Sequence, residues 1–271
     1  MQLTSFDEIT TQYRHIFLSP HFDDAVFSCG GTLGVQVSCG LRPLVITVFG
    51  GIPSGDMRLS PFAQQIHRTM GANAAQSPEA LVQKRRKEDA AALDYLQVDY
   101  LWLNYLDAIY RGNPAYYTAN SQLFGGEINP NDFPIDKQFA QDLLALQERL
   151  PDTAWYVPLG VGGHVDHQLV ASAADRLVQA GAKVYFYEEF AYALQEGAVQ
   201  ARLNELGGTF EPRLVEMSEM LPLRLGAAKL YASQIASQFE DVEKMRRAIA
   251  TYAHNIRPVE TVHLERYWVA Q

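Results

Sequence analysis

Two short segments of the chain combine histidine and aspartate at close spacing: His21-Phe22-Asp23-Asp24 and His164-Val165-Asp166-His167. In the first, a histidine and an aspartate three residues apart can reach one cation from a turn, and the adjacent aspartate then stays free to act as a base. In the second, two histidines three residues apart lie on one side of a helical turn. Histidine nitrogens and carboxylate oxygens are common zinc ligands, and a catalytic zinc site keeps one position open. The alternative for each segment alone is a capped turn with solvated histidines.

Both segments follow a predicted strand. Residues 15–19 and 154–158 are short apolar runs, typical of strands that are buried on both faces of a sheet. The ends of two such strands can be neighbours in a parallel sheet, although the two segments lie more than 140 residues apart in the sequence. Both would then face one crevice at the carboxyl edge, where open α/β folds bind ligands. Together, the segments therefore favour a metal site over two unrelated turns.

The rest of the chain supplies the elements that would position these segments. Apolar runs predict further strands at 43–49, 100–104 and 183–187. Helical patterns alternate with the strands, near 29–39, 79–97, 136–150 and 166–180. A helical region covers 221–253, and a last strand fits within 261–269. This alternation predicts a single α/β domain over residues 1–271, with a Rossmann-like, mostly parallel sheet and helices on both faces.

Two segments interrupt the alternation of strands and helices. Residues 50–78 and 108–135 are rich in Gly, Pro, Asn and Ser, and each is longer than a compact domain normally holds without a function. Because both follow a predicted strand, both should lie over the carboxyl edge of the sheet. We expect them to form the wall of a pocket; insertions on the surface without a functional role are the alternative.

Composition narrows the functional classes. A net charge of −9 does not suit a protein that binds the phosphate backbone of nucleic acids. Cys29 and Cys39 form no C-x-x-C pair, which excludes a disulfide scaffold and a cysteine-based zinc site, and we expect both to be small buried residues. No run reaches the roughly 18 apolar residues of a membrane helix. The first residues carry no basic, apolar leader, so we expect a cytoplasmic location.

Arg85 and Asp107 are further candidates for contacts in the pocket. Arg85 lies in the basic run 84–87 of a predicted helix; most of that run is typical of a solvated face, but one arginine near the helix start can point at the pocket. Asp107 follows a predicted strand, where turn capping and a contact to a substrate hydroxyl are equally open. The glycine-rich run 29–34 does not match G-x-G-x-x-G, which disfavours a dinucleotide site. The remaining histidines lack partner spacing and are expected to be structural or solvated: His15, His67, His254 and His263.

At these residues the chain resembles the LmbE-like, or PIG-L, zinc-dependent deacetylases. Residues 19–25 running into 28–32 are similar to the first signature of that family, usually His-Pro-Asp-Asp followed by a Gly-Gly turn. Residues 163–167 are similar to the second, usually His-Pro-Asp-His, and Arg85-x-x-Glu88 is similar to an Arg-x-x-Glu helix of the family. The resemblance runs in order from about residue 14 to residue 268. Phe22 and Val165 stand where the family usually has proline, which leaves the candidate ligands in place.

The resemblance implies a role for each candidate residue. One Zn²⁺ ion per chain would have three protein ligands: His21, Asp24 and His167. The catalytic residues would be Asp23 as general base and later acid, His164 as the group that stabilises the oxyanion, and Asp166 as the group that orients His164. An aspartate partner of this kind would keep His164 protonated. Arg85 and Asp107 would contact the substrate.

The implied activity is removal of an N-acetyl group from a small conjugate that contains N-acetylglucosamine, by metal-activated water. Two alternatives stay open. One is a zinc amidase that acts on another amide, such as a glycosylated natural product, and the other is a non-catalytic Rossmann-like protein that binds a nucleotide or a sugar. The expected partner is a small molecule, and association into a homo-oligomer stays open.

Overall fold

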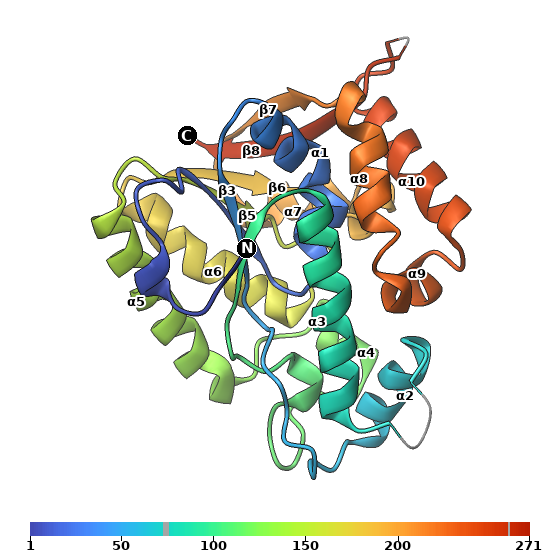
Figure 1. Cartoon of the computed structure of the whole chain (residues 1–271). Helices are drawn as coiled ribbons and strands as arrows, with labels where there is room; N and C mark the ends of the chain where they lie inside the picture. The colour runs from blue at the N-terminus through green and yellow to red at the C-terminus, as the bar shows by residue number, and fades with distance from the viewer. Residues whose placement is uncertain (73–75, 260) are drawn as a thin grey trace.

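A mostly parallel sheet of eight strands forms the centre of the molecule (Figure 1). The computed structural model describes residues 1–72, 76–259 and 261–271. The strand order is β1-β4-β3-β2-β5-β6-β8-β7, and only β8 runs antiparallel to its neighbours within these residues. The strands are β1 (Gln2–Leu3), β2 (His15–Ser19), β3 (Pro43–Thr47), β4 (Asp99–Trp102), β5 (Ala154–Pro158), β6 (Lys183–Tyr187), β7 (Phe210–Glu216) and β8 (Leu264–Ala270). The expected fold class, a single Rossmann-like α/β domain, is confirmed.

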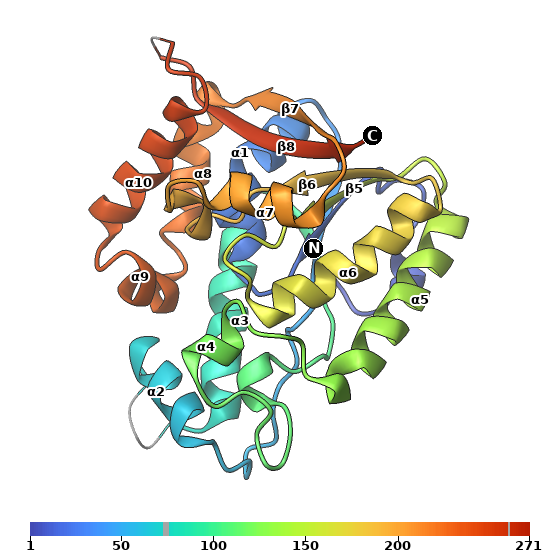
Figure 2. The same ribbon diagram turned by 180° about the vertical axis from the view of Figure 1, so that it is seen from behind.

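The apolar core lies in two layers, one on each face of the sheet (Figures 1 and 2). Neighbouring residues of β2 alternate between the layers: Phe17 packs into one, and Ile16 and Leu18 pack into the other. The first layer is covered by α1 (Asp24–Ser38), α3 (Pro78–Tyr95), α8 (Leu221–Ala228), α9 (Ala232–Gln238) and α10 (Val242–Asn255). The second is covered by α5 (Phe133–Arg149), α6 (Val165–Gln179) and α7 (Ala198–Leu206).

Several elements differ from the sequence prediction. The helix expected at 29–39 begins at Asp24, and the helical region 221–253 is divided into α8, α9 and α10. Strand β7 was not predicted because most of its residues are exposed, so it has no apolar run. Cys29 is buried as expected, but Cys39 is exposed at the C-cap of α1, so the expectation of two buried cysteines was wrong.

The two expected loop segments contain short helices. Segment 50–78 holds α2 (Pro61–Thr69), and its residues 73–75 lie outside the described part of the chain. Segment 108–135 holds η2 (Ala108–Tyr110), α4 (Asn120–Leu123) and η3 (Pro130–Asp132). In the described residues, no helix combines the length and the apolar character needed to cross a lipid bilayer.

Strands β2 and β5 are neighbours, as the sequence predicts. His15 pairs with Ala154 and Ile16 with Trp155, while β3 pairs with the other side of β2. The order of strands therefore reverses between β2 and β5. Loops that leave two such strands diverge, and the space between them is where open α/β sheets bind ligands. Helix α1 begins just beyond β2 and α6 begins just beyond β5, so both helix N-termini lie at this point.

The C-terminal strand braces α1 from the side. Glu265 of β8 accepts hydrogen bonds from the backbone N–H groups of Gly31 and Thr32, each at 2.7 Å. Its carboxylate also pairs with Arg224 of α8 at 3.0 Å, and Arg224 donates to the carbonyl oxygen of Phe27. A Cβ atom on Gly31 would lie 2.8 Å from Glu265 Oε1, so this close approach requires glycine. The brace thus fixes the helix that begins with Asp24.

Replacement of Glu265 tests this brace. Glu265→Ala leaves the buried guanidinium of Arg224 without its partner, and we expect the free energy of unfolding to fall by about 3–5 kcal/mol. The matched control is Glu211→Ala in β7, whose pair with Arg213 is exposed and whose loss should cost less than about 1 kcal/mol. Urea unfolding followed by circular dichroism measures both variants. Equal losses would show that the buried pair is no more important than the exposed one.

Candidate active site

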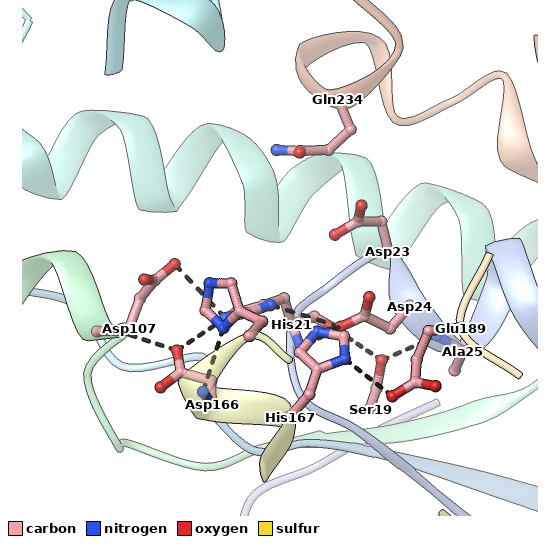
Figure 3. A network of polar contacts seen from close by, with 12 residues as sticks. Ser19, His21, Asp23, Asp24, Ala25, Asp107, Asp166, His167, Glu189 and Gln234 are labelled. Carbon is pink, nitrogen blue, oxygen red and sulfur yellow. Dashed lines mark hydrogen bonds and ion pairs between the residues drawn. The ribbon is translucent and has the colours of Figure 1, made fainter. Parts of the chain in front are cut away.

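The sheet brings the two histidine-aspartate segments to one place. The ring of His21 lies 4.9 Å from that of His164 and 5.4 Å from that of His167, centroid to centroid. Figure 3 shows the side chains that surround His21 and His167. All eight residues singled out in the sequence are buried: His21, Asp23, Asp24, Arg85, Asp107, His164, Asp166 and His167. Asp166 and His167 form the floor, and the other six line a cavity.

Each candidate histidine ligand has one ring nitrogen held by a carboxylate (Figure 3). His21 Nε2 lies 2.9 Å from Asp166 Oδ2, and His167 Nδ1 lies 3.2 Å from Glu189 Oε1. The other two nitrogens face Asp24 Oδ2, at 3.5 Å for His21 Nδ1 and 3.3 Å for His167 Nε2. Carboxylate-held histidines of this kind are typical of metal sites, because the second bond fixes the ring and its tautomer.

The buried nitrogen of His167 tests the fit of a metal ion. His167 Nε2 makes no hydrogen bond, although its side chain has no exposed surface and Asp24 Oδ2 lies 3.3 Å away. A buried polar atom without a partner is rare and costly, and a cation at this nitrogen would satisfy it. The ligand atoms of His21, His164 and His167 also lie within 4.8 Å of one another. The donor set of two imidazoles and the Asp24 carboxylate therefore fits zinc, with His164 at its edge.

A second group, His21 with Asp107 and Asp166, also has mutually close ligand atoms. Asp166 is already neutralised there by Arg111, whose Nη1 lies 2.6 Å from Asp166 Oδ1. A cation in this second position would meet the positive guanidinium. The group beside Asp24 is thus the better metal site of the two.

The structure corrects the expected relation between Asp166 and His164. The Asp166 carboxylate contacts His21 and Arg111, and it is the backbone N–H of Asp166 that donates to His164 Nδ1, at 3.1 Å. His164 Nδ1 therefore accepts, which leaves the proton on Nε2. Burial and the neighbouring His21 hold the pKa of His164 well below its usual value. His164 is a neutral N-cap of α6 in this arrangement, and the expectation of a protonated His164 was wrong.

Asp23 lines the cavity, and each of its carboxylate oxygens accepts a hydrogen bond. Arg85 Nη2 donates to Oδ1 at 3.3 Å, and Gln238 Nε2 donates to Oδ2 at 3.2 Å. Burial and the charge of Asp24 raise the pKa of Asp23, and Arg85 opposes them. The guanidinium carbon of Arg85 lies 5.3 Å from the ring centre of Phe22, so the residue that replaces the usual proline supports Arg85. A carboxylate with a raised pKa beside a metal site suits a general base.

Two residues that the sequence analysis did not assign complete the floor. Arg111 pairs with Asp166 and, at 2.9 Å, with Asp132 Oδ2, which ties segment 108–135 to the site. Nothing around Arg111 in the sequence forms a motif. Glu189 accepts from the backbone of Gly160 at 2.6 Å besides holding His167. Its position just beyond β6, at the edge shared with the two motifs, is the signal that could have found it.

The cavity has a volume of about 320 Å³ and a mixed wall. Segments 50–78 and 108–135 contribute apolar and polar side chains: Ile66, Thr69, Met70, Ile109, Leu123 and Phe124. The backbone N–H of Gly125 donates a hydrogen bond to the carbonyl oxygen of Gly163 at 2.7 Å, which joins segment 108–135 to the loop before His164. Asp107 caps its own turn by accepting from Ile109 N at 3.2 Å, and its second oxygen lies 3.6 Å from Arg85. Turn capping is therefore present, and a substrate contact by Asp107 stays a prediction.

Comparison with known proteins settles the family. The model of the family PIG-L: GlcNAc-PI de-N-acetylase matches residues 16–178. The chain belongs to the PIG-L family. It is 31% identical, over 83% of its length and 82% of the relative, to a 2'-N-acetylparomamine deacetylase of Niallia circulans. A 2'-N-acetylparomamine deacetylase of Streptomyces fradiae is 29% identical over 82% of this chain and 73% of that one.

A solved deacetylase structure shares the fold of this chain. The zinc-inhibited form of teicoplanin deacetylase Orf2 superposes with a TM-score of 0.77 and 27% identity, over 95% of this chain and 98% of that chain. The resemblance to PIG-L deacetylases drawn from the two motifs is confirmed, and the relatives are N-deacetylases, which supports an enzyme.

The pairing of Arg111 with Asp166 predicts a stability that depends on pH. Burial alone would raise the pKa of Asp166, but Arg111 and His21 outweigh it and hold that pKa well below its usual value. Arg111→Met leaves Asp166 and Asp132 buried without a guanidinium partner. We expect the free energy of unfolding at pH 7 to fall by about 3–5 kcal/mol.

The sign of the pH effect follows from the lowered pKa of Asp166. In the wild type, ionised Asp166 stabilises the fold above pH ~4, and this contribution is lost as the pH falls. In the variant, protonation relieves the Asp166 carboxylate that has lost its guanidinium partner, so the difference between the two proteins narrows from pH 7 toward pH ~4. Urea unfolding of metal-free protein at several pH values measures it, with Arg213→Met, an exposed pair, as control. A difference that does not change with pH would contradict the role of Arg111.

Proposed function

We propose that this chain is a zinc-dependent N-deacetylase that removes the acetyl group from an N-acetylglucosamine-type ring of a small conjugate. The observation that carries the proposal is the convergence of His21 Nδ1 and His167 Nε2 on Asp24, beside the cavity-facing Asp23. The 2'-N-acetylparomamine deacetylases among the relatives support a sugar-containing antibiotic precursor as the substrate class. We propose one zinc ion per chain.

In the proposed reaction, Asp23 moves the proton. Zinc, when bound, lowers the pKa of a coordinated water from about 15.7 to about 7 and polarises a carbonyl oxygen. Asp24 has its Oδ2 between the two histidines, so Asp23 is the carboxylate left to accept a proton from the attacking water. It then donates that proton to the departing amine, which is a poor leaving group without it.

His164 and Arg85 orient the reacting groups. Because the neutral His164 keeps its proton on Nε2, it can donate to the carbonyl oxygen as negative charge develops there. Arg85 holds Asp23, and with Asp107 it offers polar atoms to the sugar. Asp166 acts through His21, whose ring it fixes with Nδ1 toward Asp24.

The role of Asp23 separates catalysis from simple binding. Asp23→Asn removes the proton acceptor but keeps the size of the side chain, so we expect zinc content to stay at one per chain. We expect kcat/KM to fall by about 10²–10⁴-fold. His167→Ala should instead lose zinc, because it removes a ligand atom. Metal analysis and deacetylation assays measure both variants, and full activity in Asp23→Asn would overturn the mechanism.

A substrate screen distinguishes the proposed activity from its alternatives. The resemblance to teicoplanin deacetylase supports a second substrate class, a teicoplanin-type natural product. We expect turnover of 2'-N-acetylparomamine to exceed that of free N-acetylglucosamine and of an N-acetylated teicoplanin-type substrate. Release of acetate measures all three. Preference for the teicoplanin-type substrate would replace 2'-N-acetylparomamine as the proposed substrate class. If zinc-loaded protein turned over none of the three, a binding protein would be favoured.

A further inference from the structure

Helix α9 places two glutamines beside the proposed base, outside the residues 16–178 that the family model matches. Gln234 and Gln238 are four residues apart, so they share one face of the helix, and both line the cavity. Gln238 Nε2 donates to Asp23 Oδ2 at 3.2 Å and to Gln234 Oε1 at 3.3 Å. These two bonds use both hydrogens of the Gln238 amide nitrogen.

This network fixes the orientation of the Gln234 amide. Because Gln238 donates, Gln234 presents its oxygen to Gln238 and keeps its NH₂ group for other partners. Gln234 Nε2 donates to Ser233 Oγ over a long distance of 3.5 Å, and the Ser233 hydroxyl itself donates to Glu88. Gln234 is 4% exposed, and Figure 3 shows its amide near Asp23 without a dashed contact to the other labelled side chains. A buried donor with so weak a partner is suited to an acceptor on a ligand.

The part of the cavity wall that lies near α2 is apolar, in contrast to the polar glutamines of α9. Ile66 and Met70 line the same cavity as the α9 glutamines, and α2 and α9 lie on the same side of the molecule in both ribbon views (Figures 1 and 2). The cavity thus offers amide groups from one helix and apolar side chains from another. A sugar ring has hydroxyls on its rim and C–H groups on its faces, so it suits both walls.

We propose that Gln234 determines specificity by donating a hydrogen bond from Nε2 to a ring oxygen or hydroxyl of the acetylated sugar. Gln238 is then a positioning residue, which connects the bound sugar through Gln234 to the carboxylate of Asp23. The inference rests on the proposed function, since it takes a sugar to be the occupant of the cavity. A ring without that oxygen would be rejected, because it would leave the Gln234 donor buried and unpaired.

Binding without turnover tests the contact. Calorimetry on metal-stripped protein measures the Kd of 2'-N-acetylparomamine for the wild type, Gln234→Met and the matched control Gln200→Met. Methionine keeps the length of glutamine but removes its amide, both the Nε2 donor and the Oε1 that accepts from Gln238. We expect Gln234→Met to weaken binding about tenfold, as for the loss of one hydrogen bond. Gln200 is exposed on α7 and outside the cavity, so its variant should change Kd by less than about twofold.

The outcomes separate this inference from the proposed function. Binding by the wild type with an unchanged Kd in Gln234→Met overturns the inference alone. No binding by the wild type, together with no deacetylation by zinc-loaded protein, overturns the proposed function and the inference with it. If the wild type deacetylates the substrate but the metal-stripped protein shows no detectable binding, the KM of the zinc-loaded enzymes is compared instead of Kd. A KM that Gln234→Met leaves unchanged would then overturn the inference.

Steady-state kinetics of the zinc-loaded enzyme test the positioning role of Gln238. Gln234→Met should raise KM about tenfold, because it removes a contact to the bound sugar, and should lower kcat less than Gln238→Met does, because Gln238 keeps its own bond to Asp23. Gln238→Met should lower kcat as well, because it releases both Asp23 and the Gln234 amide. Zinc content and unfolding midpoint are measured for each variant. A loss of kcat in Gln238→Met that accompanied a loss of zinc or of folding would show a structural role only and overturn the positioning role.

Discussion

The site depends on one buried ion pair, between Arg111 and Asp166. Asp166 has no exposed surface and lies 2.6 Å from Arg111 and 2.9 Å from His21. An unpaired carboxylate at this depth would take up a proton or destabilise the fold by several kcal/mol. Because Arg111 supplies the balancing charge, Asp166 can remain ionised and accept a hydrogen bond from His21. The ring of His21 is thereby turned with its other nitrogen toward Asp24.

The same logic applies on the other side of Asp24. Glu189 is fully buried, and it accepts hydrogen bonds from the backbone of Gly160 and Val161 while it holds His167. Two carboxylates, each stabilised independently, thus aim two imidazoles at a third carboxylate. The N-terminus of α1, where Asp24 lies, adds the positive end of a helix dipole and favours negative charge there. Charge balance among these side chains therefore does not depend on a bound ion, because ion pairs between protein groups hold them in place.

Local sequence patterns predicted six of the eight strands and the two motifs, because each of these is encoded within a few residues. The strands at 15–19 and 154–158 are apolar runs, and the position of the motifs after them placed the ligands at one edge. The partners of these motifs were not predictable in the same way. Arg111, Glu189 and Gln238 come from separate parts of the chain, and only the packed fold shows which histidine or aspartate each one contacts. The direction of the Asp166 carboxylate was mispredicted for this reason: the resemblance implied a contact to His164, but the carboxylate contacts His21 and Arg111.

In the proposed function, most groups that do the chemistry and most groups that would choose the substrate lie in different parts of this molecule. The ligand atoms and their carboxylate partners lie directly beyond the strand ends, braced by α1, α6 and Glu265. The cavity wall comes instead from segments 50–78 and 108–135 and from α9. Substitutions of wall residues that take no part in an ion pair, such as Ile66, Met70 and Leu123, leave the buried pairs intact, whereas Arg111 and Asp132 of segment 108–135 belong to those pairs. Gln238 is the point where the two parts meet, because its amide bonds to the base on one side and to a wall residue on the other. A sugar that orders the wall would therefore also order Asp23, which links recognition of the ring to the position of the proton acceptor.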